Sequence, residues 1–594
     1  MKDFIKNVFS SALGVFLAIG IFTLIGAIFI IGSIVSGSQP AAIKDNSVLY
    51  IKLNGTLAEQ AVPDPLQKIL DNGDEPLGLN QLRRAIKLAK DMDEIKGIYL
   101  EAGALATDPA TLQELRKSLA DFKKSGKFIL SYGDDYTQGD YYLCSVADKV
   151  AVNPEGGVSW KGLSSQPVFY TDALAKFGVK MQVFKVGTYK SAVEPYFRTS
   201  MSDANREQVT SFMGSIWNNF VSEVSASRKI PADSLQAYAD EYLAFTPTKD
   251  LIAKKMVDTL IYIDGARNML KKYVGIAEDK KLNMVTAADI CDEEGSDIEY
   301  SSKQVAVYYA EGEIVDVAPQ GYSYPQSPYI VTENVVNDMD KLLKDDDVKA
   351  VVLRINSPGG SAYASEQMWH AIKELDKKKP VVVSMGGLAA SGGYYISSAS
   401  QYIFAEPTTL TGSIGIFGMV PDASGLLQEK LGLKYDKVNT NKLSDFYLGN
   451  ISRPLSAEEG DLVQHRIERG YQTFLSRVSE GRKKPAADVD KIGQGRVWTG
   501  EQGIKNGLVN KLGTLDDAIA YAAKKANLGD KYSAVEYPTP EPWYLNLLNK
   551  EKNNYYETQL KSTLGEYYAP FMFVKTLTSR SYIQARMPYD LNIR

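Results

Sequence analysis

An internal duplication constrains the fold of this 594-residue chain more than any other feature of its sequence. Residues 95–100 (IKGIYL) match residues 348–353 (VKAVVL), and residues 139–142 (GDYY) match residues 392–395 (GGYY), both at an offset of 253 positions. An offset of 253 positions leaves each copy long enough to form a domain with its own hydrophobic core. The chain is therefore expected to fold as two homologous domains.

Each copy alternates short apolar runs with segments of helical periodicity. In the first copy the runs are residues 48–53, 97–100, 127–131 and 149–152, and residues 111–124 have the period of an amphipathic helix. Runs rich in β-branched residues favour strands, and helical segments between them favour crossovers that join parallel strands. The pattern predicts an α/β architecture.

The division of the chain follows from where the two copies begin and end. The first repeat is expected at residues 47–295 and the second at residues 303–535, with an acidic boundary that contains Ser and Gly at residues 292–302. A tail at residues 536–594 matches neither repeat. The sequence leaves open whether this tail docks on a neighbour or is partly loose.

The amino-terminal segment has the features of a membrane anchor. Residues 13–35 carry no charge, and as a helix they would extend about 34 Å, enough to cross a bilayer core. Lys2 and Lys6 precede this stretch, whereas residues 36–42 are uncharged, so residues 1–12 are expected in the cytoplasm and the rest outside it. The alternative is a cleaved signal peptide, but its apolar core usually has about 7–15 residues. The sequence therefore predicts a single-pass protein of the inner (cytoplasmic) membrane with extracytoplasmic, or periplasmic, domains.

The composition excludes several classes of protein. With 72 acidic and 67 basic residues and no long block of one sign, nothing suggests a surface for nucleic acid. Cys144 and Cys291 cannot form a disulfide framework, and no Cys/His cluster suggests zinc, so neither a metal nor an organic cofactor is expected. The two histidines, His370 and His465, lie in segments of helical period and are expected to have structural or surface roles. A hydrolase built from this chain would need another base.

Two glycine-rich segments distinguish the second copy from the first. NSPGGS at residues 356–361 aligns with GALATD in the first copy. SMGGLAASGG at residues 384–393 aligns with SYGDDYTQGD in the first copy. Both segments follow predicted strands. Ser391, in the second segment, corresponds to Gln138 in the first copy.

Acyl transfer needs a hydroxyl at a tight turn, backbone N–H groups that meet the developing oxyanion, and a proton acceptor. Ser391 is the candidate nucleophile, since the glycines beside it leave its hydroxyl sterically open. The N–H groups of Gly359, Gly360 and Gly392 are the candidate oxyanion donors. The alternative for each segment is a tight turn without a catalytic role, and these residues alone do not identify the base.

Five motifs follow one another in order along the chain: GTYKSAVEP from residue 187, SPGG from residue 357, SMGGLAASGGYY from residue 384, TGSIGIFG from residue 411 and RVWTG from residue 496. Together they resemble the signal peptide peptidase A family in its long, two-repeat, membrane-bound form. The resemblance extends from the anchor to about residue 535 and implies two tandem ClpP/crotonase-like repeats after one transmembrane helix.

The resemblance also implies a Ser/Lys dyad with one member in each repeat. By position, the serine is Ser391 and the general base is Lys190, while Ser413 matches the serine that holds the lysine amine. A lysine acts as a base near neutral pH only when burial lowers its pKa, so Lys190 is expected to be enclosed between the repeats. Lys442 lies one position from the residue paired with Lys190 and is expected on the surface.

The family implies a membrane-bound serine endopeptidase that degrades cleaved signal peptides at the outer face of the membrane. It further implies a homotetrameric ring with the site on its inner wall. Other hydrophobic or unfolded polypeptides are possible substrates that the sequence does not separate from signal peptides. Two alternatives belong to other classes, namely a catalytically inert membrane scaffold and a crotonase-like acyl-CoA enzyme.

Overall fold

The computed structural model describes most of both repeats and a short part of the tail. It covers residues 43–60, 77–295, 303–318, 329–538 and 583–587, with isolated positions between residues 14 and 22. Within these residues no helix is both long and apolar enough to cross a membrane. The anchor predicted at residues 13–35 lies almost wholly outside them, as do residues 1–12, so both assignments stay predictions.

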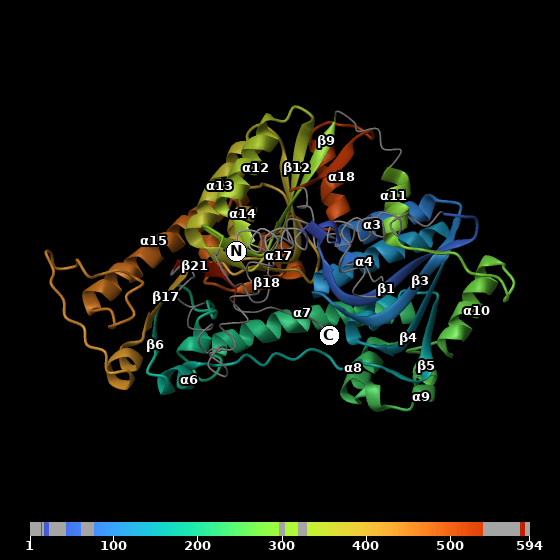
Figure 1. Cartoon of the computed structure of the whole chain (residues 1–594), viewed down its shortest axis with the longest axis horizontal. Helices are drawn as coiled ribbons and strands as arrows, with labels where there is room; N and C mark the ends of the chain where they lie inside the picture. The colour runs from blue at the N-terminus through green and yellow to red at the C-terminus, as the bar shows by residue number, and fades with distance from the viewer. Residues whose placement is uncertain are drawn as a thin grey trace, which may run out of the picture.

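The first repeat is built on a parallel sheet with the strand order β2-β1-β3-β4-β5-β7, and β8 pairs with β1 (Figure 1). The four strands expected from apolar runs are present as β1, β3, β4 and β5, and the expected helix is present as α4 (Pro109–Phe122). Each strand continues beyond its apolar run. The strands are β1 (Ser47–Ala58), β2 (Leu77–Gly78), β3 (Ile95–Ala106), β4 (Phe128–Tyr136), β5 (Lys149–Val158), β7 (Thr259–Leu260) and β8 (Met284–Val285).

The second repeat has the same core topology. Its parallel neighbours β9, β12, β14, β15 and β19 follow the order of β1, β3, β4, β5 and β7, which confirms the duplication. β16 (Leu410–Gly412), β18 (Val497–Thr499) and β20 (Ser533–Tyr537) complete this sheet. The five shared strands are β9 (Gln304–Glu311), β12 (Val348–Ser357), β14 (Val381–Ala390), β15 (Ile403–Ala405) and β19 (Lys511–Leu512).

Helices cover both faces of the second sheet, which explains why its strands read as continuous apolar runs. Successive residues of β12 point to opposite faces: Val351 and Leu353 join one core cluster, and Ala350 and Val352 join another. α12 (Thr332–Lys344) and α13 (Ala362–Asp376) contribute to the first cluster, and α18 (Leu515–Lys525) to the second.

Two long helices repeat the duplication in detail. α7 (Asp203–Arg228) and α15 (Ala457–Arg482) each have 26 residues. Each begins at a serine whose side chain accepts a backbone N–H of the first turn, Ser202 or Ser456, and each ends at a lysine with left-handed backbone. Figure 1 shows α7 running beneath β18 of the second repeat, and the two elements are in contact.

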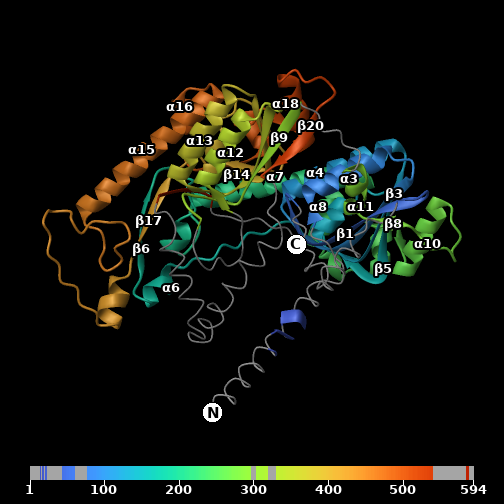
Figure 2. The ribbon, with the colours of Figure 1, turned by 45° about the horizontal axis from the view of Figure 1, so that its top comes forward.

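A third sheet joins the repeats. Its order is β11-β10-β13-β21-β17-β6, and β6 (Lys180–Lys185) of the first repeat pairs antiparallel with all six residues of β17 (Phe417–Asp422). Figures 1 and 2 both show β6 and β17 side by side near α15. The other strands are β10 (Glu313–Val315), β11 (Tyr329–Val331), β13 (Gly359–Ser361) and β21 (Ile583–Arg586). Part of the predicted tail is therefore docked on the chain itself.

A buried ionic cluster also connects the repeats. Arg354 of β12 lies 2.9 Å from the Glu59 carboxylate and 2.7 Å from that of Glu114, both from the first repeat, and all three side chains are almost completely buried. Arg354 also donates to Ser384 Oγ at 3.0 Å. Removing one partner of a buried ion pair costs about 3–5 kcal/mol, so this cluster fixes the relative position of the repeats.

Candidate active site

Ser391 lies at a sharp turn between the end of β14 and α14 (Gly392–Ser397). Its backbone has φ 55° and ψ −112°, a conformation that few non-glycine residues adopt. The Ser391 N–H donates to the Gly412 carbonyl at 2.8 Å, and the Tyr395 N–H donates to the Ser391 carbonyl at 2.8 Å. This strand–turn–helix geometry holds the hydroxyl at the end of the sheet, a placement also found at the nucleophile turn of α/β-hydrolases.

Lys190 reaches this hydroxyl from the first repeat, on the loop between β6 and the short helix Glu194–Tyr196. Its Nζ lies 2.7 Å from Ser391 Oγ. The same Nζ lies 3.1 Å from Ser413 Oγ and 3.1 Å from the Ser413 carbonyl oxygen. The three side chains that the sequence predicted to act together are therefore in hydrogen-bonding distance across the two repeats.

The amine of Lys190 is removed from water. Lys190, Ser391 and Ser413 are all 0% exposed, and burial holds the pKa of Lys190 well below its ordinary value of 10.5. No ion pair to Lys190 occurs among the described residues. Gly495 (φ 79°) packs directly on the lysine backbone, where a Cβ would lie 2.6 Å from Lys190 Cα. The enclosure thus depends on a glycine just before the RVWTG motif.

Gln208 of α7 positions the lysine loop. Its Nε2 donates to the Tyr189 carbonyl at 3.0 Å and to Ser191 Oγ at 2.9 Å, on both sides of Lys190. Its Oε1 accepts the Val497 N–H at 3.1 Å. One buried amide therefore connects the lysine loop to a strand of the second repeat.

Glu194 supports the same loop from within the GTYKSAVEP motif. Its carboxylate accepts hydrogen bonds from Ser202 Oγ at 2.5 Å, from the Ser202 N–H at 3.1 Å and from Asn205 Nδ2 at 2.9 Å. The sequence analysis assigned no role to Glu194 or Gln208. The motif was a signal for Glu194, whereas Gln208 lies in a helix where a polar residue is ordinary.

The three predicted oxyanion glycines have different surroundings. The Gly359 N–H donates to Ser357 Oγ at 3.1 Å, and Gly360 is paired with Ile314 in β10. Gly359 has φ 93°, and a Cβ there would collide with the carbonyl oxygen of Ala585 and lie 2.6 Å from the Gly392 nitrogen. The glycines thus leave room for a backbone carbonyl beside Ser391.

The equivalent place in the first repeat is filled by its own side chains. Asp140 is fully buried, and its carboxylate accepts the N–H groups of Ala104 at 3.0 Å and Leu105 at 3.2 Å. Gln138, the counterpart of Ser391, accepts the N–H groups of Lys161 and Gly162. Ala104 and Leu105 lie in the loop that corresponds to SPGG. Because their N–H groups already donate to the Asp140 carboxylate, they are not available to an oxyanion.

The remaining residues considered in the sequence lie away from this site. His370 and His465 are exposed, which agrees with the structural or surface roles expected of them. Lys442 is 76% exposed and pairs with Glu458 at 2.5 Å, so its surface placement is confirmed. Among the described residues no group of three or more His, Cys, Asp or Glu side chains could hold a metal ion.

The arrangement can support general-base catalysis of acyl transfer. A neutral amine at Lys190 has a lone pair for the Ser391 proton and two N–H groups for the oxygens of Ser413. Glycine-lined space beside Ser391 can hold the carbonyl that is attacked. The fold and the site together define a serine hydrolase built from two ClpP-like repeats.

Comparison with known families agrees with this class. The sequence profile of Peptidase family S49 matches residues 121–277 and 373–529, one match in each repeat, and the Clp protease profile matches residues 326–409. The two S49 matches together cover more than half of the chain. The chain belongs to Peptidase family S49 and is a serine protease.

Three relatives extend the match over most of the chain. Protease 4 of Salmonella typhi is 38% identical over 472 residues, which is 78% of this chain and 74% of the relative. Protease 4 of Haemophilus influenzae is 35% identical over 509 residues, 83% of this chain and 81% of the relative. The chloroplastic serine protease SPPA of Arabidopsis thaliana is 31% identical over 502 residues, 84% of this chain and 72% of the relative. Family membership favours a protease over the crotonase-like acyl-CoA enzyme and the inert scaffold.

Proposed function

We propose that this protein is a membrane-anchored serine endopeptidase in which Ser391 is the nucleophile and Lys190 is the general base. The observation that carries the proposal is the fully buried Lys190 amine, 2.7 Å from Ser391 Oγ, with oxygens of Ser413 as its other neighbours. A buried amine without a carboxylate partner is neutral at a pH where an exposed lysine is protonated.

In the first step, the neutral amine takes the proton of the Ser391 hydroxyl while Oγ attacks the scissile carbonyl. The ammonium that forms donates to the carbonyl and hydroxyl oxygens of Ser413. The N–H groups of Gly392 and Gly360 stabilise the oxyanion, and Gly359 adds its N–H when that group exchanges its bond to Ser357 Oγ for one to the oxyanion. The ammonium then protonates the leaving amine, and the regenerated base activates the water that hydrolyses the acyl-enzyme.

Cleaved signal peptides are the proposed substrates, and other hydrophobic or unfolded polypeptides are a second class. The support is the set of five motifs that resemble signal peptide peptidase A, together with the uncharged stretch at residues 13–35, which would hold the domains near the lipid. Externally added proteinase should degrade the domains in spheroplasts with an intact membrane. Protection from the proteinase would contradict the extracytoplasmic location.

The proposal includes a homotetramer, since the resembled family forms rings that exclude folded proteins. Light scattering of the detergent-solubilised protein should give the mass of four chains of 65.4 kDa. A monomeric mass would contradict this part of the proposal and leave the catalytic part unaffected.

Hydrolysis of a leucine-rich leader peptide and of unfolded casein by the detergent-solubilised protein tests the function. Ser391→Ala and Lys190→Ala should each lose nearly all activity, while Lys442→Ala, which changes an exposed lysine, should match the wild type. Activity retained by either of the first two variants would refute that residue's role. A wild type that cleaves neither substrate would favour the inert scaffold.

A further inference from the structure

Arg496, the first residue of the RVWTG motif, is bonded to one support of the Lys190 amine through its main chain. Its carbonyl accepts the N–H of Ser413 at 2.7 Å, and the hydroxyl and carbonyl oxygens of Ser413 each lie 3.1 Å from Lys190 Nζ. Ser413 has a left-handed backbone with φ 50°, and a non-glycine residue keeps such a backbone only where surrounding contacts fix it. The Arg496 carbonyl is one of these contacts, so it helps to set the oxygens that hold the amine.

The side chain of Arg496 contacts the loop that carries the lysine. Its Cζ lies over the ring of Tyr189, 4.6 Å from the ring centroid, and over the ring of Trp498, 4.5 Å from the ring centroid. Its Nη1 also donates to the Tyr189 hydroxyl at 3.0 Å. Tyr189 is the residue before Lys190 in the first repeat, whereas Arg496 and Trp498 belong to the second repeat. One guanidinium group therefore connects the second repeat to the residue next to the base.

Stacking on the two rings, rather than an ion pair, is the main contact of this guanidinium group. Its Nη1 lies 2.8 Å from the Glu207 carboxylate, but the Glu207 side chain is 55% exposed, and an ion pair with so exposed a member contributes little to stability. The Arg496 side chain is only 19% exposed, and its buried Nε has no hydrogen-bond partner among the described residues. A lysine has no planar group to stack on the rings, so it is not equivalent to arginine at this position.

The main chain of the lysine loop has further contacts of its own. The Tyr189 N–H donates to the Gln494 carbonyl at 2.9 Å, and the Tyr189 carbonyl accepts Gln208 Nε2 at 3.0 Å. These hydrogen bonds remain when the guanidinium group is changed. Loss of the stacking contact should therefore loosen the loop without unfolding the protein.

We propose that Arg496 is a positioning residue for the general base, which holds the Tyr189–Lys190 segment with its guanidinium group and Ser413 with its carbonyl. It acts through these residues rather than on the reacting atoms. Together the two contacts fix the Lys190 amine relative to the Ser413 oxygens and the Ser391 hydroxyl. This inference rests on the proposed function, because the position of Lys190 matters for turnover only if Lys190 is the base.

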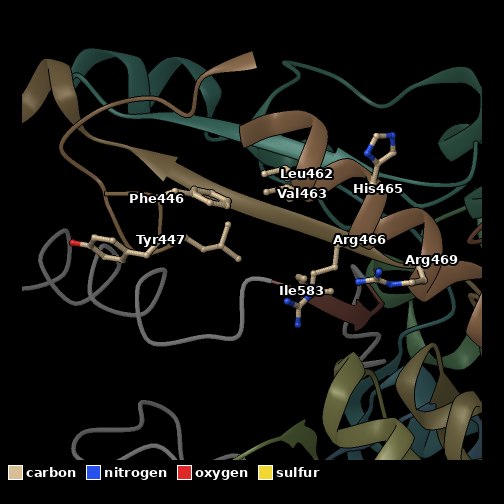
Figure 3. Close-up of a pocket in the computed structure, with 9 residues that line it drawn as sticks. Phe446, Tyr447, Leu462, Val463, His465, Arg466, Arg469 and Ile583 are labelled. Carbon is tan, nitrogen blue, oxygen red and sulfur yellow. The ribbon is translucent and has the colours of Figure 1, made fainter. Parts of the chain in front are cut away.

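Arg496→Lys keeps the positive charge and removes the planar group, so it tests the stacking directly. Its kcat for the leader peptide should fall at least about tenfold while KM stays within about twofold, because a displaced base slows the chemical step and leaves substrate contacts in place. Glu207→Gln, which removes only the exposed ion pair, should keep kcat within about twofold. Arg466→Lys makes the same chemical change at an exposed arginine of α15, which lines the cavity in Figure 3, and should match the wild type.

The pH profile of kcat distinguishes positioning from a loss of folded protein. Hydrolysis requires a neutral Lys190, so kcat rises with pH through the pKa of this amine. A loosened loop admits water to the amine and raises its pKa towards the ordinary value of 10.5, so the midpoint should move up by at least about 0.5 pH unit in Arg496→Lys. Lys185, whose Nζ donates to the Lys190 carbonyl at 3.4 Å, and Glu194 keep their charges in every variant. A lower kcat with an unmoved midpoint would assign Arg496 a structural role and overturn the proposal.

Tyr189 provides a second pair of variants. Tyr189→Phe keeps the ring that faces the guanidinium group, whereas Tyr189→Leu removes it, so kcat should be at least about fivefold higher in the first variant than in the second. The double variant Arg496→Lys/Tyr189→Leu should lose little more kcat than the more damaged single variant, because both changes remove the same contact. Losses that multiply would show two independent roles and overturn the proposal.

Hydrogen exchange separates this inference from the catalytic proposal. In Arg496→Lys the amide protons of residues 187–193 should exchange at least about tenfold faster than in the wild type, whether or not Lys190 is the base. Unchanged exchange, with Lys190→Ala inactive, would refute the positioning role and leave the dyad in place. Faster exchange, with Lys190→Ala active, would refute the dyad and leave Arg496 as the residue that holds the loop.

Discussion

Replacing Lys190 with methionine should abolish activity and change how stability depends on pH. The methionine side chain has nearly the length of the lysine side chain and fits the space that Lys190 occupies, but it cannot take a proton. Hydrolysis should fall at least about 10²-fold, the usual contribution of a general base. The activity loss alone does not separate a base from a structural lysine, so the pH dependence of stability is the sharper measurement.

The sign of that dependence follows from burial. The unfolded chain keeps a proton on Lys190 up to its ordinary pKa of 10.5, whereas the folded chain has a pKa well below that value. Between the two pKa values the unfolded state binds one more proton, so the free energy of unfolding rises with pH across this window. It falls as the pH is lowered towards the folded pKa. The slope due to this one group approaches about 1.4 kcal/mol per pH unit.

The assay compares denaturant unfolding of wild type and Lys190→Met between about pH 7 and 9, within the window below the unfolded pKa. The variant leaves the hydroxyls of Ser391 and Ser413 without the amine, which costs about 1–3 kcal/mol but does not vary with pH. The difference in unfolding free energy, wild type minus variant, should therefore increase with pH. Lys442→Met, at an exposed lysine, should run parallel to the wild type. Parallel curves for Lys190→Met would show a protonated Lys190 in the folded state and refute its role as a base.

Three further changes test the surroundings of the site. Arg354→Met removes the buried cation beside Glu59 and leaves Glu114 with Arg83 as its cationic partner, so it should lower the free energy of unfolding by about 3–5 kcal/mol; an unchanged denaturation midpoint would contradict the role of the ionic cluster. Gln208→Ala should reduce kcat about 10–100-fold with little change in KM, because it displaces the lysine loop without touching substrate, and a wild-type kcat in steady-state assays would refute this role. Gln138→Ser combined with Ser391→Ala should restore no hydrolysis, since Asp140 occupies the oxyanion position of the first repeat; activity above the Ser391→Ala background would contradict that explanation.

Much of the fold could be predicted because the same pattern of apolar runs and helical segments occurs in both halves of the sequence. Strands such as β12 are buried on both faces and read as continuous apolar runs, and the repeat spacing gave the order of the elements. The third sheet could not be predicted, because the pairing of β6 with β17 joins segments more than 200 residues apart without a local signal. The docking of β21 has the same origin, since four residues of a strand carry no periodic pattern.

The sequence predicted the residues at the centre of the candidate site, but not the residues that position them. Ser391 lies in a glycine-rich segment that its sister copy lacks, and the resemblance supplied Lys190 and Ser413. Gln208 could not be found, since its role depends on a buried contact to Val497 across the repeats. The occupation of the first repeat's site by the Asp140 carboxylate was also not foreseen, because an acidic residue in place of a glycine is typical of an ordinary surface change.

The central claim is that Ser391 and Lys190 act as one catalytic pair across the two repeats. The most direct measurement is mass spectrometric mapping of the full-length protein after reaction with a serine-directed phosphonate, in wild type and in Lys190→Met. The account predicts a single adduct on Ser391 that forms at least about 10²-fold more slowly in the variant. An adduct on another serine, or equal rates in the two proteins, would contradict it.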